Sequence, residues 1–163
     1  MKPISIIVAI AENNAIGKNN QLLYHIPGDM KRFRQITTGH TVVMGKRTYF
    51  SLPKRPLRDR INIVVSDDRN DNFEGCVMAY SIEEAIEKCN DCDENFIIGG
   101  GIIYREFFPF SNKLYLTRIH KSFDADTFFP EIDPDQWIVR EEVDAMDGAQ
   151  AEVKCTFLIL ERL

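Results

Sequence analysis

The chain has 163 residues and a mass of 18.8 kDa, the size of one domain with enough residues for a sizeable hydrophobic core. Hydrophobic residues make up 44% and charged residues 28% of it, as in ordinary soluble globular proteins, and no apolar run approaches the length of a membrane span. The net charge of -5 and the pI near 5.2 argue against non-specific nucleic-acid binding as its main task.

Strand-like and helix-like segments alternate through the first two thirds of the chain. We expect strands at residues 4–11, 41–44, 61–66, 77–79 and 96–98 and helices at residues 27–37, 46–51, 81–89 and 102–108. This alternation predicts a mainly parallel sheet covered by helices. The last third has further strand-like segments with no helix between them, at residues 114–119, 137–143 and 153–160. The expected fold is a single α/β domain over residues 1–163, with a mainly parallel β-sheet, antiparallel C-terminal strands and flanking helices.

The first predicted strand leads into a segment rich in turn-forming residues. The apolar run at residues 4–11 is followed by Glu12 and two asparagines, so it lacks the cleavage-site pattern of a signal peptide, and we expect a buried strand in a cytoplasmic protein. Residues 12–21 contain four Asn and one Gly. A long connection of this composition at the carboxyl end of a strand is typical of a binding loop, which we expect to lie beside Asp29.

An acidic residue lies within the apolar side of the first predicted helix. At about 100° per residue, Asp29 falls between Phe33 and Ile36 on the side that faces the core. That side also contains Ile26 and Met30, and the opposite side is formed by Lys31, Arg32, Arg34 and Gln35. An Asp in the first turn can cap backbone N–H groups, whereas an inward carboxylate is also typical of proton-transfer sites. This segment alone leaves both interpretations open.

Two strand-to-helix junctions have the composition of phosphate-binding turns. The first has Gly45 followed by Lys46, Arg47 and Thr48, which suit the isolated phosphates of an anionic ligand. Its spacing disfavours a Walker A loop, because five residues instead of four separate the glycines. The second has three consecutive glycines, whose backbone N–H groups could approach a diphosphate. With the inward carboxylate, they indicate a long anionic cofactor that meets a second ligand at Asp29.

A basic loop and four cysteines carry weaker signals. Residues 53–60 contain four cations, which form either a solvated loop or a dock for anionic groups. The cysteines include one Cys-Asn-Asp-Cys motif but lack a second pair or suitably spaced histidines. We therefore expect reduced structural thiols and no metal site.

Taken together, these motifs resemble the dihydrofolate reductase family of the bacterial type along almost the whole chain. The segments that carry the resemblance are residues 16–17, 26–33, 43–48, 98–104, 114–117 and 126–130. The resemblance implies an NADPH-dependent oxidoreductase that reduces 7,8-dihydrofolate to 5,6,7,8-tetrahydrofolate for one-carbon metabolism and thymidylate synthesis. It also implies a monomer that binds antifolate inhibitors and has no nucleic-acid or membrane partner.

The resemblance further implies roles for individual residues. Asp29 would bind the amino-pyrimidine edge of the pterin and promote protonation at N5, with Thr117 and Tyr24 as the other catalytic residues. Arg60 would pair with the α-carboxylate of the glutamate tail, and a cis peptide bond would follow Gly99. The implied substrate-binding residues are Ile7, Val8, Asp29, Phe33, Ser51, Leu52, Arg55, Arg60, Ile98 and Thr117. The implied cofactor-binding residues are Ala9, Ile16, Gly45, Lys46, Arg47, Thr48, Ser66, Gly99, Gly100, Gly101, Ile102 and Tyr104.

Two positions depart from the family pattern. Tyr24 stands where the family usually has Trp, so we expect an ordered water near the pterin to be held differently and turnover to be lower. Asp67 would repel a 2′-phosphate, although Lys46 and Arg47 still favour NADPH over NADH. Two alternatives are a reductase domain of flavin biosynthesis that acts on a ribosylated pyrimidine, and a non-catalytic nucleotide-binding module in which Asp29 is a helix-end charge.

Overall fold

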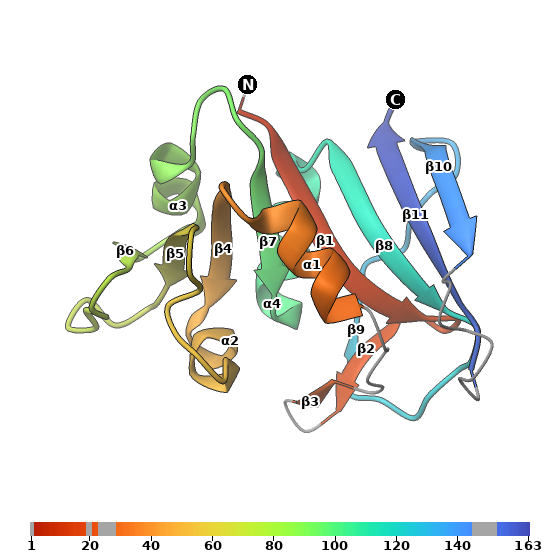
Figure 1. Cartoon of the computed structure of the whole chain (residues 1–163), viewed down its shortest axis with the longest axis horizontal. Coiled ribbons are helices and arrows are strands. Elements are labelled where there is room, and N and C mark those ends of the chain that lie inside the picture. Colours follow the sequence, from red (N-terminus) through yellow and green to blue (C-terminus); the bar gives the residue numbers. More distant parts are fainter. Residues whose placement is uncertain (1, 19–20, 23–28, 145–152) are drawn as a thin grey trace.

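The central element is an eight-stranded sheet (Figure 1). It is seen in a computed structural model that describes residues 2–18, 21–22, 29–144 and 153–163. The strand order is β10-β11-β8-β1-β7-β4-β5-β6. The strands are β1 (Ile4–Ala11), β4 (Thr41–Gly45), β5 (Ile61–Val65), β6 (Val77–Ala79), β7 (Asn95–Gly99), β8 (Lys113–Ile119), β10 (Trp137–Asp144) and β11 (Cys155–Arg162). All pairs from β8 to β6 along this order are parallel, whereas β11 pairs antiparallel with β8 and with β10. The predicted parallel sheet with an antiparallel C-terminal edge is confirmed.

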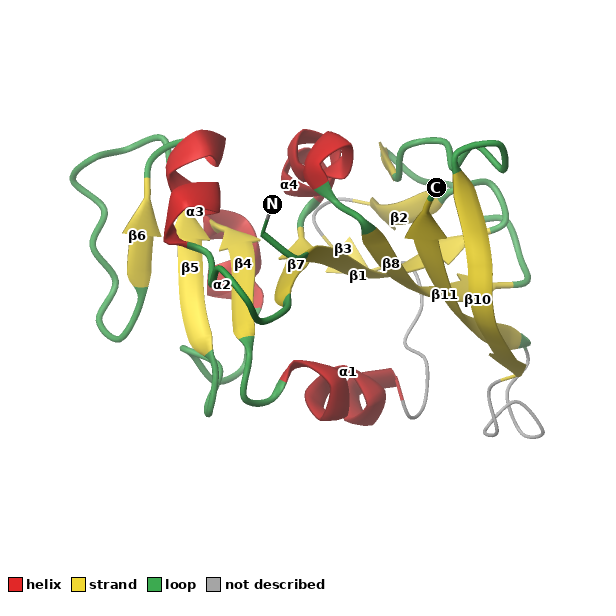
Figure 2. Ribbon diagram, turned by 90° about the horizontal axis from the view of Figure 1, so that it is seen from above, coloured by secondary structure: helices red, strands yellow, loops and turns green. Residues whose placement is uncertain are grey.

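Helices cover both faces of this sheet, as Figure 2 shows for α1 on one side and for α3 and α4 on the other. The helices are α1 (Asp29–Thr37), α2 (Lys46–Ser51), α3 (Ile82–Lys88) and α4 (Gly101–Phe107), followed by the 3-10 turn η1 (Phe108–Phe110). Local sequence explains where α3 begins, because the Ser81 side chain caps the helix by accepting a hydrogen bond from the Glu84 amide. Within the described ranges, no helix combines the length and apolar character needed to cross a membrane.

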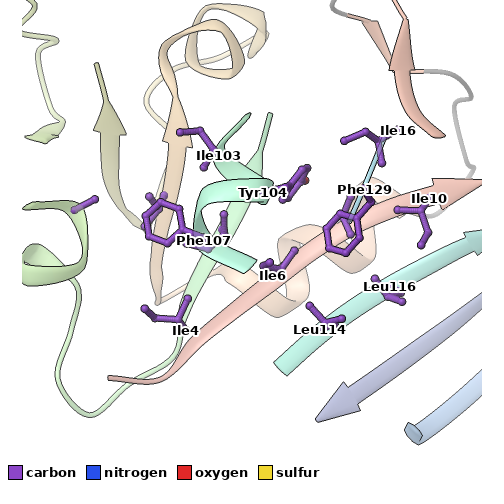
Figure 3. Close-up of a cluster of buried hydrophobic side chains, with 14 of the residues drawn as sticks. Ile4, Ile6, Ile10, Ile16, Ile103, Tyr104, Phe107, Leu114, Leu116 and Phe129 are labelled. Atoms are coloured by element: carbon purple, nitrogen blue, oxygen red, sulfur yellow. The ribbon is translucent and has the colours of Figure 1, made fainter. Parts of the chain in front are cut away.

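The alternation of side chains along the strands divides the core into two layers. On β1, Ile6 and Ile10 point into the layer beneath α3 and α4, which Figure 3 shows with Phe107 and Tyr104 of α4. Ile7 points to the opposite face and joins the layer beneath α1 and α2. Because consecutive residues of a strand face opposite sides, β1 contributes to both layers and runs through the middle of the fold.

The segment predicted as a binding loop forms strands in part, which corrects that prediction. A second sheet, of order β3-β2-β9, is built from β2 (Ala15–Lys18), β3 (Gln21–Leu22) and β9 (Thr127–Phe128). Ala15 and Ile16 are buried, and β2 pairs with β9 from more than 100 residues later in the chain. The local composition of Asn and Gly predicts turns, whereas this pairing depends on a distant strand that the local pattern does not contain.

Candidate active site

The carboxylate of Asp29 lies at the first turn of α1 and faces β8 of the central sheet. The hydroxyl of Thr117, which is 2% exposed, donates a hydrogen bond of 2.8 Å to Asp29 Oδ1. The two residues are 88 positions apart in the sequence, so only the packing of α1 against the sheet brings them together. The pair consists of a partly buried carboxylate and a buried hydroxyl, which can together bind and orient a polar group with hydrogen-bond donors.

The inward side of α1 differs from the predicted one at two residues. Met30 is 53% exposed, whereas the half-buried Arg32 places its guanidinium carbon 4.3 Å from the centre of the Phe157 ring. Asp29, Phe33 and the partly buried Ile36 define the centre of this side; at 100° per residue Arg32 lies roughly 60° from it and Met30 roughly 100°. An Arg can bury its apolar stem and stack its cation on an aromatic ring, so it can occupy a half-buried position. Hydropathy alone does not predict this arrangement.

Arg32 is also part of the electrostatic environment of Asp29. Burial lowers the pKa of the Arg32 guanidinium, while the nearby carboxylates of Asp29 and Glu141 act in the opposite direction. Phe157 lies on β11 directly opposite Thr117 of β8, so the cation, the ring, the hydroxyl and the carboxylate form one group. The sequence pattern places Arg32 on the solvent side of α1. Its position almost one helical turn after Asp29 is the signal that points to an interaction between the two side chains.

Apolar residues of the implied substrate pocket lie in one layer on the same face of the sheet as Asp29. Ile7, Phe33, Leu52 and Ile98 belong to the core layer beneath α1 and α2. Val8 packs in the opposite layer, so it can reach this pocket only through its backbone. The result is an apolar wall beside the carboxylate of Asp29.

The two implied arginines sit in different environments. Arg60 donates from Nη1 to Thr37 Oγ1 at 3.0 Å, so it lies against the end of α1, and burial followed by the proximity of Arg34 lowers its pKa. Arg55 is exposed and donates to the Phe50 carbonyl at 2.7 Å. Ser51 is exposed too, and its hydroxyl donates to the Thr48 carbonyl at 2.7 Å. Of the two arginines, Arg60 therefore lies closer to α1.

The three-glycine turn lies at the carboxyl end of β7, next to the turn after β4. The peptide bond between Gly99 and Gly100 is cis, and Gly99 has a φ of 121°, which disfavours a side chain. A Cβ on Gly101 would lie 2.3 Å from Thr127 Cγ2, so a methyl group does not fit there. A Cβ on Gly100 would lie 3.6 Å from Thr48 Oγ1, which places the two turns side by side. The packing of Thr127 therefore requires a glycine at position 101, and Gly100 lies beside Thr48 of the cationic turn.

Tyr104 joins this turn to β1. Its buried hydroxyl donates to the Ile7 carbonyl at 2.9 Å, and burial, with the proximity of Asp29, raises its pKa. Ile16 is 8% exposed in the same core layer, Ala9 is partly buried on β1, and Ile102 is 67% exposed. Tyr104 is therefore close both to the glycine turn and to Asp29.

The cationic turn after β4 faces a carboxylate that the sequence analysis missed. Lys46 Nζ lies 2.8 Å from Asp71 Oδ2, and the Ser66 hydroxyl donates to the same oxygen at 2.5 Å. The run of acidic residues after Ser66 is the sequence signal for this carboxylate, although the sequence analysis singles out Asp67 alone. The donors fit an anionic ligand, because an internal anion already bridges a cation and a hydroxyl there. Arg47 is exposed and Thr48 partly buried on the same turn.

A metal centre has no candidate in the described part of the chain, where no group of three or more His, Cys, Asp or Glu side chains is arranged to hold an ion. The cysteines Cys76, Cys89, Cys92 and Cys155 are all free thiols. Tyr24, implied as catalytic, and Ile26, expected on the apolar side of the helix, lie outside the described residues.

Comparisons with known proteins agree on one family. The model of the dihydrofolate reductase family matches residues 3–162. The dihydrofolate reductase of Haemophilus influenzae is 42% identical over 158 residues, covering 97% of this chain and 98% of its own. That of Bacillus subtilis is 41% identical over 134 residues, covering 82% and 79%. A solved dihydrofolate reductase from Enterococcus faecalis, in complex with NADP(H) and RAB-propyl, has a TM-score of 0.86 and 31% identity, covering 98% of this chain and 96% of that one.

Proposed function

Because the chain belongs to the dihydrofolate reductase family, we propose that it uses Asp29 to control the proton that accompanies reduction of 7,8-dihydrofolate by NADPH. The reaction forms 5,6,7,8-tetrahydrofolate, the reduced carrier of one-carbon units. The observation that carries the role of Asp29 is its 2.8 Å hydrogen bond with Thr117 at the edge of an apolar wall. One carboxylate is enough for this role, because each reduction adds a single proton to the substrate.

NADPH supplies the hydride when it is bound, so the chain's own task is to bind and orient the two ligands and to exclude water. Asp29 accepts hydrogen bonds from the amino-pyrimidine edge of the pterin and promotes protonation at N5. Thr117 holds the carboxylate in that orientation through its hydroxyl. A carboxylate beside apolar side chains loses part of its hydration, which strengthens its hydrogen bonds to a bound ring.

The substrate is held by the apolar layer around Asp29 and by one cation. Ile7, Phe33, Leu52 and Ile98 lie in one layer, which supports their contact with the pterin and benzoyl rings. Arg60 binds the α-carboxylate of the glutamate tail, since an arginine can bind a carboxylate through two parallel hydrogen bonds. Antifolate inhibitors compete for the same site.

The cofactor is held by the two turns that lie side by side. Lys46, Arg47, Thr48 and Ser66 bind the phosphates of the adenosine half, and the residue type supports this because all four are hydrogen-bond donors. Gly99, Gly100 and Gly101 let the backbone approach the diphosphate, and the position of Gly100 beside Thr48 of the cationic turn supports this role. Ala9, Ile16 and Tyr104 flank the nicotinamide end, and Ile102 contacts the cofactor from the start of α4.

A substrate assay tests the function. Purified protein is mixed with NADPH, and the NADPH absorbance is followed after adding either dihydrofolate or a ribosylated aminopyrimidine, the substrate class of the related reductase of flavin biosynthesis. We expect oxidation with dihydrofolate only. Oxidation with the ribosylated pyrimidine alone would reassign the substrate, and binding of NADPH without turnover of either would leave a non-catalytic module.

The chain is further proposed to act as a single-domain monomer in the cytoplasm. Four free thiols support a reducing compartment, and one continuous sheet that joins the first and last strands supports a single domain. Sedimentation of the purified protein at micromolar concentration should give a mass near 18.8 kDa. A mass of twice that value would contradict the monomer.

A further inference from the structure

An internal carboxylate occupies the donors that the proposed function assigns to a cofactor phosphate. Asp71 Oδ2 accepts hydrogen bonds from the Ser66 hydroxyl at 2.5 Å and lies 2.8 Å from Lys46 Nζ. The Asp71 side chain is 16% exposed, so it is withdrawn against these two partners. Lys46 and Ser66 come from different strand ends, those of β4 and β5, and the carboxylate bridges them.

The connection between β5 and β6 holds this carboxylate in position. The Asp71 amide donates to the Asp68 carbonyl at 3.0 Å, and the Asp71 carbonyl accepts from the Tyr80 hydroxyl at 2.9 Å. The Asp68 amide in turn donates to Ser66 Oγ at 3.1 Å. The backbone on either side of the carboxylate is therefore fixed by hydrogen bonds, and the carboxylate does not depend on a ligand for its place.

The charges around this site act against a second anion. Hydrogen bonding to Asp71, followed by the nearby carboxylates of Asp68 and Asp67, raises the pKa of Lys46. Hydrogen bonds from Lys46 and Ser66 lower the pKa of Asp71, so it remains ionised at neutral pH. A phosphate that approached Lys46 would meet three carboxylates and would have to displace one of them.

We propose that Asp71 is a specificity-determining residue for the cofactor: its carboxylate competes with the 2′-phosphate of NADPH for Lys46 and Ser66 and narrows the preference for NADPH over NADH. The inference rests on the proposed function, in which Lys46 and Ser66 hold that phosphate. NADH carries a ribose hydroxyl at this position. A carboxylate can accept a hydrogen bond from that hydroxyl, whereas it repels a phosphate. Removing the charge of Asp71 therefore favours NADPH selectively.

The test is calorimetric titration of NADPH and of NADH into the wild type, Asp71→Asn and Asp67→Asn at one fixed salt concentration, because salt screens these charges. Asp67→Asn is the matched control, since it removes the same charge from a residue with a smaller influence on Lys46. We expect Asp71→Asn to increase the ratio of NADPH to NADH affinity by roughly ten-fold, the scale of a charge-assisted hydrogen bond, and Asp67→Asn to increase it by less than about three-fold.

A double variant tests the route through Lys46. If the carboxylate competes for that cation, the effect of Asp71→Asn on the affinity ratio should largely disappear in a Lys46→Met background. Fluorescence of Trp137, the one tryptophan in the chain, shows whether each variant unfolds with the wild-type midpoint. Should Asp71→Asn weaken both nucleotides equally, or leave their ratio unchanged, the carboxylate has only an ordering role and the proposal is wrong.

The outcomes separate this inference from the function on which it rests. Turnover of dihydrofolate with an unchanged affinity ratio in Asp71→Asn overturns the role of Asp71 and leaves the reductase activity intact. Absence of both turnover and nucleotide binding in the wild type overturns the proposed function, and the role of Asp71 with it.

Discussion

At the scale of single residues, the site depends on a carboxylate whose surroundings come from three distant parts of the chain. Asp29 lies on α1 and Thr117 on β8. Phe157, whose ring packs against the guanidinium of Arg32, lies on β11. The buried hydroxyl gives Asp29 one fixed hydrogen bond from the sheet. An acid that only capped the helix would not require a hydroxyl from the sheet.

Replacing the Thr117 hydroxyl tests this arrangement. Thr117→Val keeps the shape of the side chain and removes the 2.8 Å hydrogen bond to Asp29. We expect kcat/KM for dihydrofolate to fall roughly ten- to 100-fold, because a hydrogen bond to a charged group is worth about 1.5–3 kcal/mol. Steady-state kinetics with Thr117→Ser as the control, which keeps a hydroxyl, should show most of the activity retained. Equal loss in both variants would mean that packing, not the hydroxyl, matters.

The sequence predicts the residue types of this site better than their directions. Helical periodicity correctly turned Asp29, Phe33 and Ile36 inward, since each lies close to the centre of the inward side. It failed for Met30 and Arg32 at the edges of that side, where the ring of Phe157 decides which side chain is covered. Contacts with a strand more than 100 residues away are not encoded in the helix alone.

At the scale of elements, the glycine turn after β7 is fitted to a strand from the small second sheet. Gly101 begins α4, and a Cβ at this position would approach Thr127 Cγ2 of β9 to 2.3 Å. The sequence pattern identified the turn and its glycines, because an apolar strand stops at them. It did not predict β9 or its contact with the turn, because a two-residue strand has no periodicity to detect.

A methyl group at Gly101 should therefore destabilise the fold. We expect Gly101→Ala to lower the free energy of unfolding by about 1–3 kcal/mol, the usual cost of overpacking, and the melting temperature by about 2–4 °C per kcal/mol. Urea titration, monitored by the fluorescence of Trp137, measures the free energy of unfolding. Thr127→Ser removes the clashing methyl group, so the double variant should recover most of the loss, and no recovery would place the strain elsewhere.

At the scale of the whole molecule, the sheet carries a core layer on each face, and the site lies on the face covered by α1. The order of strands could not be predicted from the sequence, since β1 pairs with β7 and β8, which lie far along the chain. The alternation of elements was sufficient to predict the parallel sheet and its antiparallel edge. The layer beneath α3 also buries Cys89, whose titration links stability to pH.

Stability should fall in alkaline solution through Cys89. Burial raises the pKa of this thiol from 9.0 to about 11, although Lys2 opposes the shift. Between these pH values the unfolded chain loses the proton and the folded chain keeps it, so the free energy of unfolding decreases as pH rises from about 9 to 11. Urea titrations across this range should give a smaller decrease for Cys89→Ala than for the wild type, each referred to its own value at pH 7. Identical slopes would contradict the prediction.

The most direct test of the account is a single-turnover measurement of NADPH oxidation by the wild type and by Asp29→Asn, with dihydrofolate in excess. We expect the variant to bind NADPH as tightly as the wild type and to oxidise it roughly 10²-fold or more slowly, the usual loss when an acid-base group is removed. Such a result would assign control of the proton to Asp29. Equal rates in the two proteins would contradict the account and leave Asp29 as a charge at the end of a helix.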